Sequence, residues 1–254
     1  MVPTTIKQPM KSFLRKDESR GIPIQWIKRD QYSWLSQLFK NPFIKPEITP
    51  YSAKIERLAQ QTNQLGAQPL WEGYAGNNIG GPTRLPDDVR TANAAGDLYT
   101  FLVRERKPDV VVKFGTAFGV SGMYFLAGIE SNGKGKLLTF EPNDVWARLA
   151  KNNLLQISDR FDLIVGTFEE NIEDSLPQHQ PIDMAFIDAI HTREFVIPQL
   201  ELVVSKSNNN AIIILDDINF SPDMRECWKE VSTDGRFSAS AALGDRVGIL
   251  ELTG

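Results

Sequence analysis

From residue 110 onward, short runs of apolar residues alternate with segments of helical pattern. The apolar runs cover residues 110–112, 136–140, 161–165, 182–187 and 211–215. Helical pattern precedes the first run at 89–106 and follows the second at 145–155. Runs that are apolar at nearly every position are typical of strands buried on both faces. Strands that alternate with helices predict an α/β fold, in which a mostly parallel, Rossmann-like sheet carries helices on both faces.

The end of the chain has a different pattern. Two strand-like runs, 237–242 and 246–252, are joined by a short turn around Leu243, Gly244 and Asp245. Such a turn between two runs predicts a hairpin, so we expect the last strand to lie antiparallel to its neighbours. Together with the five runs above, the hairpin gives an expected sheet of seven strands.

The first 85 residues lack this regular alternation. Prolines are frequent there, and helical pattern is confined to residues 31–40 and 51–65. Residues 76–81 are rich in Gly and Asn, which predicts a loop. We therefore expect a helical and loop-containing N-terminal extension, residues 1–85, followed by a main domain, residues 86–254.

A glycine-containing loop follows the first strand of the main domain. Its residues are Gly115, Thr116, Ala117, Phe118, Gly119, Val120 and Ser121. Glycines there let the chain turn sharply and let a ligand approach the N–H groups at a helix N-terminus. The second apolar run is followed by Glu141, and an acidic residue at that place can accept both ribose hydroxyls of an adenosine. The two features together favour an adenosine-containing cofactor, although a tight turn would explain the loop alone and a surface charge would explain Glu141 alone.

These segments resemble the cofactor motifs of a known family. Residues 110–121, Glu141 and residues 166–168 are similar to those of O-methyltransferases related to catechol O-methyltransferase, a branch of the class I S-adenosylmethionine-dependent methyltransferases. The resemblance covers about residues 86–252 and implies S-adenosylmethionine as the cofactor. It also implies the binding residues, namely Gly115, Thr116, Ala117, Gly119 and Ser121 for the methionine part, Glu141 for the ribose, Thr167 and Phe168 beside the adenine, and Asp188.

One position departs from that family. Two places before Gly115, where the family usually has an acidic residue, this chain has Lys113. A lysine there would repel the ammonium group or the sulfonium of the cofactor. Lys113 could instead pair with the carboxylate of the cofactor or with a neighbouring acid. It could also weaken cofactor binding, or be an altered residue of this particular chain.

Three aspartates follow the fourth and fifth apolar runs. Asp188 ends the fourth, and Asp216 and Asp217 end the fifth. Neighbouring carboxylates repel unless a cation joins them, and oxygen ligands suit Mg²⁺, Mn²⁺ or Ca²⁺. The sequence therefore predicts a divalent metal held by Asp188, Asp216 and Asp217, and the resemblance implies the same positions. The alternative is that each aspartate caps a helix.

His191 lies three residues after Asp188 and is expected to share its site. Imidazole exchanges a proton near neutral pH, which suits a general base. The step from Asp188 to His191 is most similar to metal-dependent sugar O-methyltransferases of antibiotic pathways, in which the matching histidine is the proposed base. The expected function is thus metal-assisted methylation of a hydroxyl on a small molecule of secondary metabolism, such as a natural-product sugar, a phenol or a polyketide.

Composition narrows the partners and the location. The formal net charge is −4 and the chain has no long basic run, which argues against nucleic acid. No apolar stretch approaches the ~20 residues of a membrane helix, and Cys227 is the only cysteine, so we expect a cytoplasmic protein without a membrane partner. The extension, with Trp26, Trp34, Trp71 and Tyr74, is expected to supply the acceptor pocket or the contact of a homo-oligomer, unless these aromatic residues belong to the core.

Two rival functions stay open on the sequence. An NAD-dependent oxidoreductase is disfavoured because the loop lacks the G-x-G-x-x-G spacing and because the chain ends in a hairpin. A binding protein that keeps the methyltransferase fold without activity is favoured only by Lys113.

Overall fold

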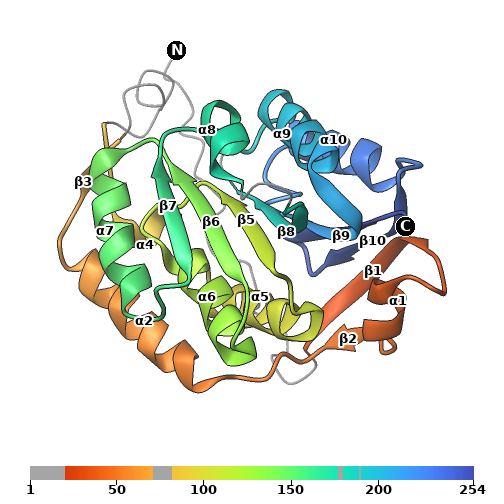
Figure 1. Ribbon diagram of the computed structural model, residues 1–254, viewed down its shortest axis with the longest axis horizontal. Helices are drawn as coiled ribbons and strands as arrows, with labels where there is room; N and C mark the ends of the chain where they lie inside the picture. Colours follow the sequence, from red (N-terminus) through yellow and green to blue (C-terminus); the bar gives the residue numbers. More distant parts are fainter. Residues whose placement is uncertain (1–20, 71–81, 177–179, 189) are drawn as a thin grey trace, which may run out of the picture.

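The structure, a computed structural model, describes residues 21–70, 82–176, 180–188 and 190–254. A nine-stranded sheet runs through it in the order β2-β1-β10-β11-β9-β8-β5-β6-β7 (Figure 1). Its parallel part consists of β5 (Val110–Phe114), β6 (Lys136–Glu141), β7 (Phe161–Val165), β8 (Ile182–Ile187) and β9 (Ser207–Leu215). The antiparallel pairings involve β10 (Phe237–Leu243), β11 (Val247–Leu252), β1 (Ile22–Arg29) and β2 (Phe43–Ile44).

The seven strands after residue 86 confirm the predicted sheet. All five residues of β5 are buried, as a strand covered on both faces requires. The hairpin of β10 and β11 is also confirmed, and β11 lies antiparallel to β9, with Gly248 opposite Leu215. The fold is therefore the Rossmann-like arrangement expected from the sequence.

The N-terminal extension differs from the prediction because it is not only helical. Its β1 pairs with β10 and its β2 pairs with β1, so both strands extend the main sheet. Buried and less buried residues alternate along β1, the pattern of a strand with one face on the core. The structure does not test the division of the chain after residue 85, which stays a prediction.

Helices cover both faces of the sheet (Figure 1). One face packs against α1 (Trp34–Leu38), α2 (Pro50–Asn63), α5 (Asn93–Arg106), α6 (Val120–Asn132) and α7 (Asp144–Leu155). The other packs against α8 (Phe168–Ser175), α9 (Arg193–Ser205) and α10 (Pro222–Ser232). The short elements β3 (Gln68–Pro69), β4 (Thr83–Arg84) and α4 (Pro86–Val89) complete the described structure. Among the described helices, none is long and apolar enough to cross a membrane.

Of the four aromatic residues singled out in the extension, the two that the structure describes, Trp26 and Trp34, pack against the core. Trp26 contacts Phe39, with ring centres 6.3 Å apart, and Trp34 belongs to α1. The carboxylate of Glu251 on β11 accepts hydrogen bonds from the backbone N–H groups of Trp34 and Leu35, both at 2.8 Å, which fixes α1 to the sheet. Trp71, Tyr74 and the predicted loop at 76–81 lie outside the described residues.

Candidate active site

The candidate residues follow three neighbouring strands whose carboxyl ends lie at one edge of the sheet. Phe114 at the end of β5 pairs with Ile187 of β8, and Ile187 pairs with Leu215 of β9. The segments that begin at Gly115, at Asp188 and at Asp216 therefore start side by side. In open α/β sheets this edge is where ligands bind.

The loop after β5 has the backbone conformation that its glycines allow. Gly115 and Gly119 have φ angles of 68° and 85°, and Ala117 between them also has a positive φ. A Cβ on Gly119 would lie 3.2 Å from the Cα of Ala150, so a side chain there would push α6 away from α7. The loop leads directly into α6, and its backbone N–H groups lie at the positive end of that helix.

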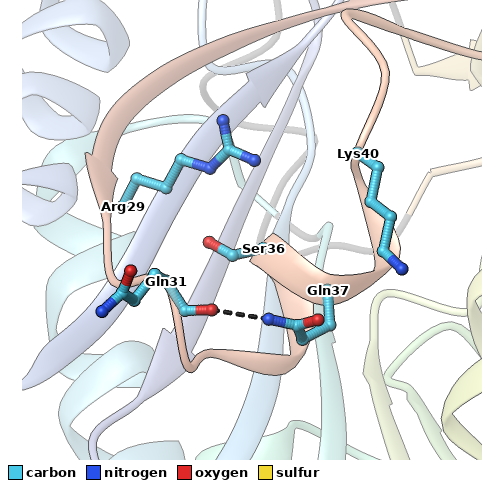
Figure 2. A pocket seen from close by; sticks show the side chains of 5 residues that line it. All are labelled: Arg29, Gln31, Ser36, Gln37 and Lys40. Carbon is cyan, nitrogen blue, oxygen red and sulfur yellow. Dashed lines mark hydrogen bonds between the residues drawn. The ribbon is translucent and has the colours of Figure 1, made fainter.

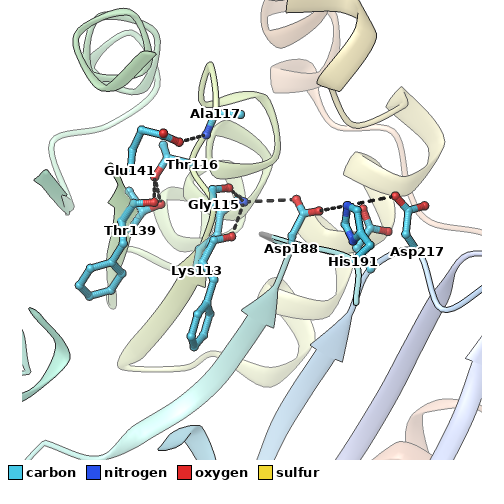
Figure 3. Close-up of polar contacts among 12 residues, drawn as sticks. Lys113, Gly115, Thr116, Ala117, Thr139, Glu141, Asp188, His191 and Asp217 are labelled. Atoms are coloured by element: carbon cyan, nitrogen blue, oxygen red, sulfur yellow. Dashed lines mark hydrogen bonds and ion pairs between the residues drawn. The ribbon is translucent and has the colours of Figure 1, made fainter. Parts of the chain in front are cut away.

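Glu141, at the end of β6, turns toward this loop (Figure 3). Its carboxylate accepts hydrogen bonds from the backbone N–H groups of Ala117, at 2.7 Å, and of Asn143, at 3.0 Å. Its exposed fraction is only 5%. Burial raises the pKa of Glu141 to about 7, although the two N–H donors and Lys113 oppose this shift. A buried carboxylate held beside the glycine loop fits the predicted acceptor of ribose hydroxyls.

The other predicted cofactor residues have different surroundings. The hydroxyl of Thr116 faces β6 rather than the loop. It lies 2.6 Å from Thr139 Oγ1 and donates to the carbonyl oxygen of Phe140 at 2.9 Å. Ser121 is buried in the first turn of α6. These contacts hold the loop in place against β6.

Thr167 and Phe168, predicted to lie beside the adenine, follow β7 at the same edge of the sheet. Thr167 is the N-cap residue of α8, and its hydroxyl accepts a hydrogen bond from Glu170 N. The ring of Phe168 is buried against Phe114 and Phe140, with ring centres 3.7 and 5.3 Å away. The structure therefore places the Phe168 ring in the core, and a role beside the adenine stays a prediction.

Lys113 pairs with a neighbouring acid, one of the alternatives that its position allowed. Its side chain is 0% exposed, and its Nζ lies 3.4 Å from Oδ2 of Asp188 (Figure 3). The same ammonium group donates to the carbonyl oxygens of Phe114 and Gly115 and lies 4.9 Å from the ring centre of Phe186. Burial lowers the pKa of Lys113, which the charge of Asp188 opposes. Burial likewise raises the pKa of Asp188 well above its ordinary value, which Lys113 opposes.

Asp216 and Asp217 bind an arginine that the sequence analysis missed. Arg246, in the turn between β10 and β11, donates from Nε to Oδ1 of Asp216 at 2.7 Å and from Nη2 to Oδ2 at 2.6 Å. Burial alone would raise the pKa of Asp216, but the hydrogen bonds and charge of Arg246 outweigh it and lower the value. Arg246 also reaches Asp217, with Nε 3.2 Å from Oδ1.

His191 lies between the aspartates of the two strand ends (Figure 3). Its Nε2 is 3.4 Å from Oδ2 of Asp217 and 4.0 Å from Oδ1 of Asp188. The side chain of His191 is 23% exposed, and its ring faces that of Phe220, with centres 5.3 Å apart. Phe220 is itself 52% exposed. The imidazole thus lies between two carboxylates and remains partly exposed.

The structure brings together Asp188, His191, Asp216 and Asp217, as the sequence predicted, and adds Arg246 and Tyr99 to them. The hydroxyl of Tyr99, on α5, is buried and has no hydrogen-bond partner among the described residues. Burial raises the pKa of Tyr99, and the nearby charges of Asp216 and Asp188 raise it further. A signal for Arg246 was present, because a hairpin beside β9 puts its turn next to the residues that follow β9.

A polar cavity of about 350 Å³ lies elsewhere in the molecule (Figure 2). It is lined by Arg29, Gln31, Ser36, Gln37 and Lys40, at β1 and α1. Arg29 pairs with Ala239 near the start of β10, whereas Arg246 follows the end of β10. The cavity is therefore at the opposite edge of the sheet from the candidate site.

Comparisons with known proteins agree with this geometry. Residues 112–218 match a protein family described as a methyltransferase domain, and this range contains the glycine loop, Glu141, His191 and the three aspartates. No curated protein matches the sequence.

Solved structures share the fold at low identity. One is an O-methyltransferase of tomaymycin synthesis from Streptomyces achromogenes, in complex with SAM. It is 15% identical with a TM-score of 0.58, and the match covers 98% of its chain and 88% of this one. An O-methyltransferase from Bacillus cereus, in complex with SAH, is 18% identical with a TM-score of 0.58 and coverages of 99% and 88%. A putative O-methyltransferase from Klebsiella pneumoniae is 18% identical, with a TM-score of 0.56 and coverages of 98% and 88%.

Proposed function

We propose that this chain, which carries a methyltransferase domain of the class I fold, transfers the methyl group of S-adenosylmethionine to a hydroxyl of a small molecule. The observation that carries the proposal is the position of His191. Its Nε2 faces Asp217 and Asp188, and Asp188 follows β8, the strand that pairs with β5 before the glycine loop. A partly exposed imidazole beside a cofactor loop suits the removal of a proton from a bound acceptor.

The residues that would hold the cofactor fit it in chemistry. Each carboxylate oxygen of Glu141 accepts one backbone N–H and keeps a second lone pair that suits a ribose hydroxyl. The loop from Gly115 to Gly119 lies at the start of α6, with the N–H groups of Thr116 and Gly119 bonded to Phe140 O and Thr116 O. When bound there, S-adenosylmethionine supplies a methyl group on a positively charged sulfur. Lys113 does not add a free positive charge to this region, because its ammonium group is paired with Asp188 and two carbonyl oxygens.

In the proposed reaction, His191 takes the proton of the acceptor hydroxyl. The oxygen forms a bond to the methyl carbon as the carbon–sulfur bond breaks, and the bonding electrons stay on sulfur. Asp217, 3.4 Å from Nε2, orients the imidazole and stabilises the imidazolium that results. The protein thus contributes position and charge rather than a covalent intermediate.

The predicted divalent metal does not fit the side chains as the structure describes them. Both carboxylate oxygens of Asp216 bind Arg246, and Lys113 lies beside Asp188. Within the described ranges, no three His, Cys, Asp or Glu side chains are arranged to hold a metal ion. No step above therefore uses a metal.

The acceptor class rests on similarity and on the surroundings of His191. Similar structures include O-methyltransferases, one of which serves tomaymycin synthesis. The exposed ring of Phe220 beside His191 offers an apolar surface to an organic acceptor. We further propose that the N-terminal extension supplies part of the acceptor pocket or a contact of a homo-oligomer.

Calorimetric titration with S-adenosylhomocysteine, and then with NAD⁺, tests the cofactor class directly. We expect S-adenosylhomocysteine to bind and NAD⁺ not to bind; the reverse would contradict the proposal and favour an oxidoreductase. Binding without turnover across a broad screen of hydroxyl acceptors would favour a binding protein instead.

Once an acceptor is found, His191→Ala tests the base. We expect kcat to fall on the order of 10²- to 10⁴-fold, the usual effect of losing a general base. The affinity for S-adenosylhomocysteine should stay within about twofold, because His191 lies on the acceptor side of the site. An unchanged kcat would remove His191 from the mechanism.

A further inference from the structure

Resting on the proposed function, we propose that Arg246 takes the place of a divalent cation in this site, so that methyl transfer proceeds without a metal. Three carboxylates at two neighbouring strand ends need positive charge nearby. In this chain two side chains supply the positive charge: Arg246 from the hairpin turn on one side, and Lys113 from β5 on the other.

The guanidinium of Arg246 uses the oxygens that a metal would need. It binds both oxygens of Asp216 in a forked arrangement, at 2.7 and 2.6 Å. Its Nε and Nη2 lie 3.2 and 3.3 Å from the two oxygens of Asp217. Arginine suits this role because its planar donors match carboxylates in pairs and because it keeps its charge.

The backbone of Arg246 is also held in place. Its carbonyl oxygen accepts a hydrogen bond from Ile218 N at 3.0 Å, which joins the hairpin turn to the segment after β9. Gly244, with a φ of 64°, lets the chain turn two residues before it. A metal could enter only if this guanidinium moved away from a carboxylate that is 1% exposed.

Asp188, the third carboxylate, is held from the opposite side. Lys113 lies 3.4 Å from it, beneath the glycine loop. Three aspartates and two fixed cations leave a formal charge of about −1 at the site, compared with −3 if both cations were absent. A site of that charge has little remaining attraction for a divalent ion.

Arg246 is then a positioning residue that acts through Asp217. It contacts both oxygens of that carboxylate, and His191 lies 3.4 Å from Oδ2. Removing the guanidinium should free the oxygens of Asp216 and Asp217 and open the site to a metal. A role that was only structural would not create a metal site.

The test measures Mn²⁺ binding by electron paramagnetic resonance, on the wild type and on Arg246→Ala. The assay uses about 100 µM Mn²⁺, which saturates a site whose dissociation constant is in the low micromolar range. At this concentration we expect no binding to the wild type. We expect about one Mn²⁺ ion bound per chain for Arg246→Ala. Binding to the wild type would overturn the proposal, and so would a folded Arg246→Ala that binds none.

Arg236→Ala is the matched control. Arg236 binds both oxygens of Glu201, each at 2.7 Å, but precedes β10 at the opposite end of the same hairpin. Arg236→Ala should lose a forked ion pair, one more exposed than that of Arg246, without gaining Mn²⁺. If Arg246→Ala does not fold, Arg246→Gln replaces it, and the melting temperature of each variant identifies the folded ones.

The activity arm compares wild-type methyl transfer with excess EDTA and with added Mg²⁺. We expect rates within about twofold, while loss of activity in EDTA would overturn the proposal. Failure of the proposed function would appear separately, as absence of S-adenosylhomocysteine binding, because the Mn²⁺ measurement needs neither cofactor nor acceptor.

Discussion

At the ends of β5 and β6, Glu141 is surrounded by backbone N–H groups, whereas at the ends of β8 and β9 three aspartates are surrounded by cationic side chains. The first region, the cofactor half of the site, comprises the loop from Gly115 to Ser121 with Glu141. The second, the acceptor half, comprises Asp188, His191, Asp216 and Asp217 with their cations Lys113 and Arg246. The two halves meet at Lys113, whose ammonium group contacts Gly115 O and Asp188.

The difference shows two ways to stabilise buried carboxylates at the carboxyl ends of the strands: with backbone N–H donors or with cationic side chains. Backbone donors are fixed by the fold and offset the burial of Glu141 only in part, since burial still raises its pKa to about 7. Among the side-chain cations, Arg246 lowers the pKa of Asp216, whereas burial raises the pKa of Asp188 despite Lys113, and each pair depends on both partners. We therefore expect the acceptor half to be sensitive to loss of a cation and the cofactor half to be sensitive to loss of the carboxylate itself.

Lys113→Met should give the largest effect on stability. It removes the buried cation beside Asp188, and breaking a buried ion pair from one side costs about 3–5 kcal/mol of unfolding free energy. Urea unfolding measures this loss. The double variant Lys113→Met with Asp188→Asn should recover much of it, because no unpaired charge remains.

Lys134→Met is the control for that comparison. Lys134 lies closer to its partner, with Nζ 2.8 Å from Oδ1 of Asp109, but both side chains are exposed. Exposed pairs contribute less than about 1 kcal/mol. Equal effects of the two single variants would show that the acceptor half does not depend on its built-in cations.

Glu141→Ala should have the next largest effect, this time on cofactor affinity. Two hydrogen bonds from ribose hydroxyls to a charged acceptor would be lost, together worth about 3 kcal/mol, or roughly 100-fold in the dissociation constant. Calorimetry with S-adenosylhomocysteine measures the change. Glu130→Ala, near the far end of α6, should leave the affinity unchanged. If Glu141→Ala binds as tightly as the wild type, the ribose does not contact Glu141.

The same contrast explains how much the sequence could predict. The strands from β5 to β9 carry continuous apolar runs, and the cofactor half consists of residues that are close together along the chain, from Gly115 to Glu141. Both were therefore visible in local patterns. β1 was not predicted, because after Ile22 its residues are alternately exposed and only half-buried and because Pro23 lies within it.

In the acceptor half the aspartates and His191 were predicted, but the cation Arg246 was not. Asp216 and Asp217 stand next to an apolar run, but their cation, Arg246, comes from a turn 30 residues later. Without it, three converging carboxylates indicate a metal. The burial of Lys113 depends on Phe186 of β8 and on Asp188, which only the pairing of β5 with β8 brings together.

The smallest expected effect is a pH dependence in the cofactor half. Ribose hydroxyls donate to the ionised form of Glu141, so binding of S-adenosylhomocysteine should weaken as pH falls through the pKa of about 7. Between pH 8 and pH 6 the ionised fraction falls about tenfold, and the dissociation constant should rise by the same factor. Glu141→Gln cannot ionise, so its weaker affinity should lack this component. Calorimetry at three pH values on both proteins checks the difference, and parallel pH profiles would assign the dependence to another group.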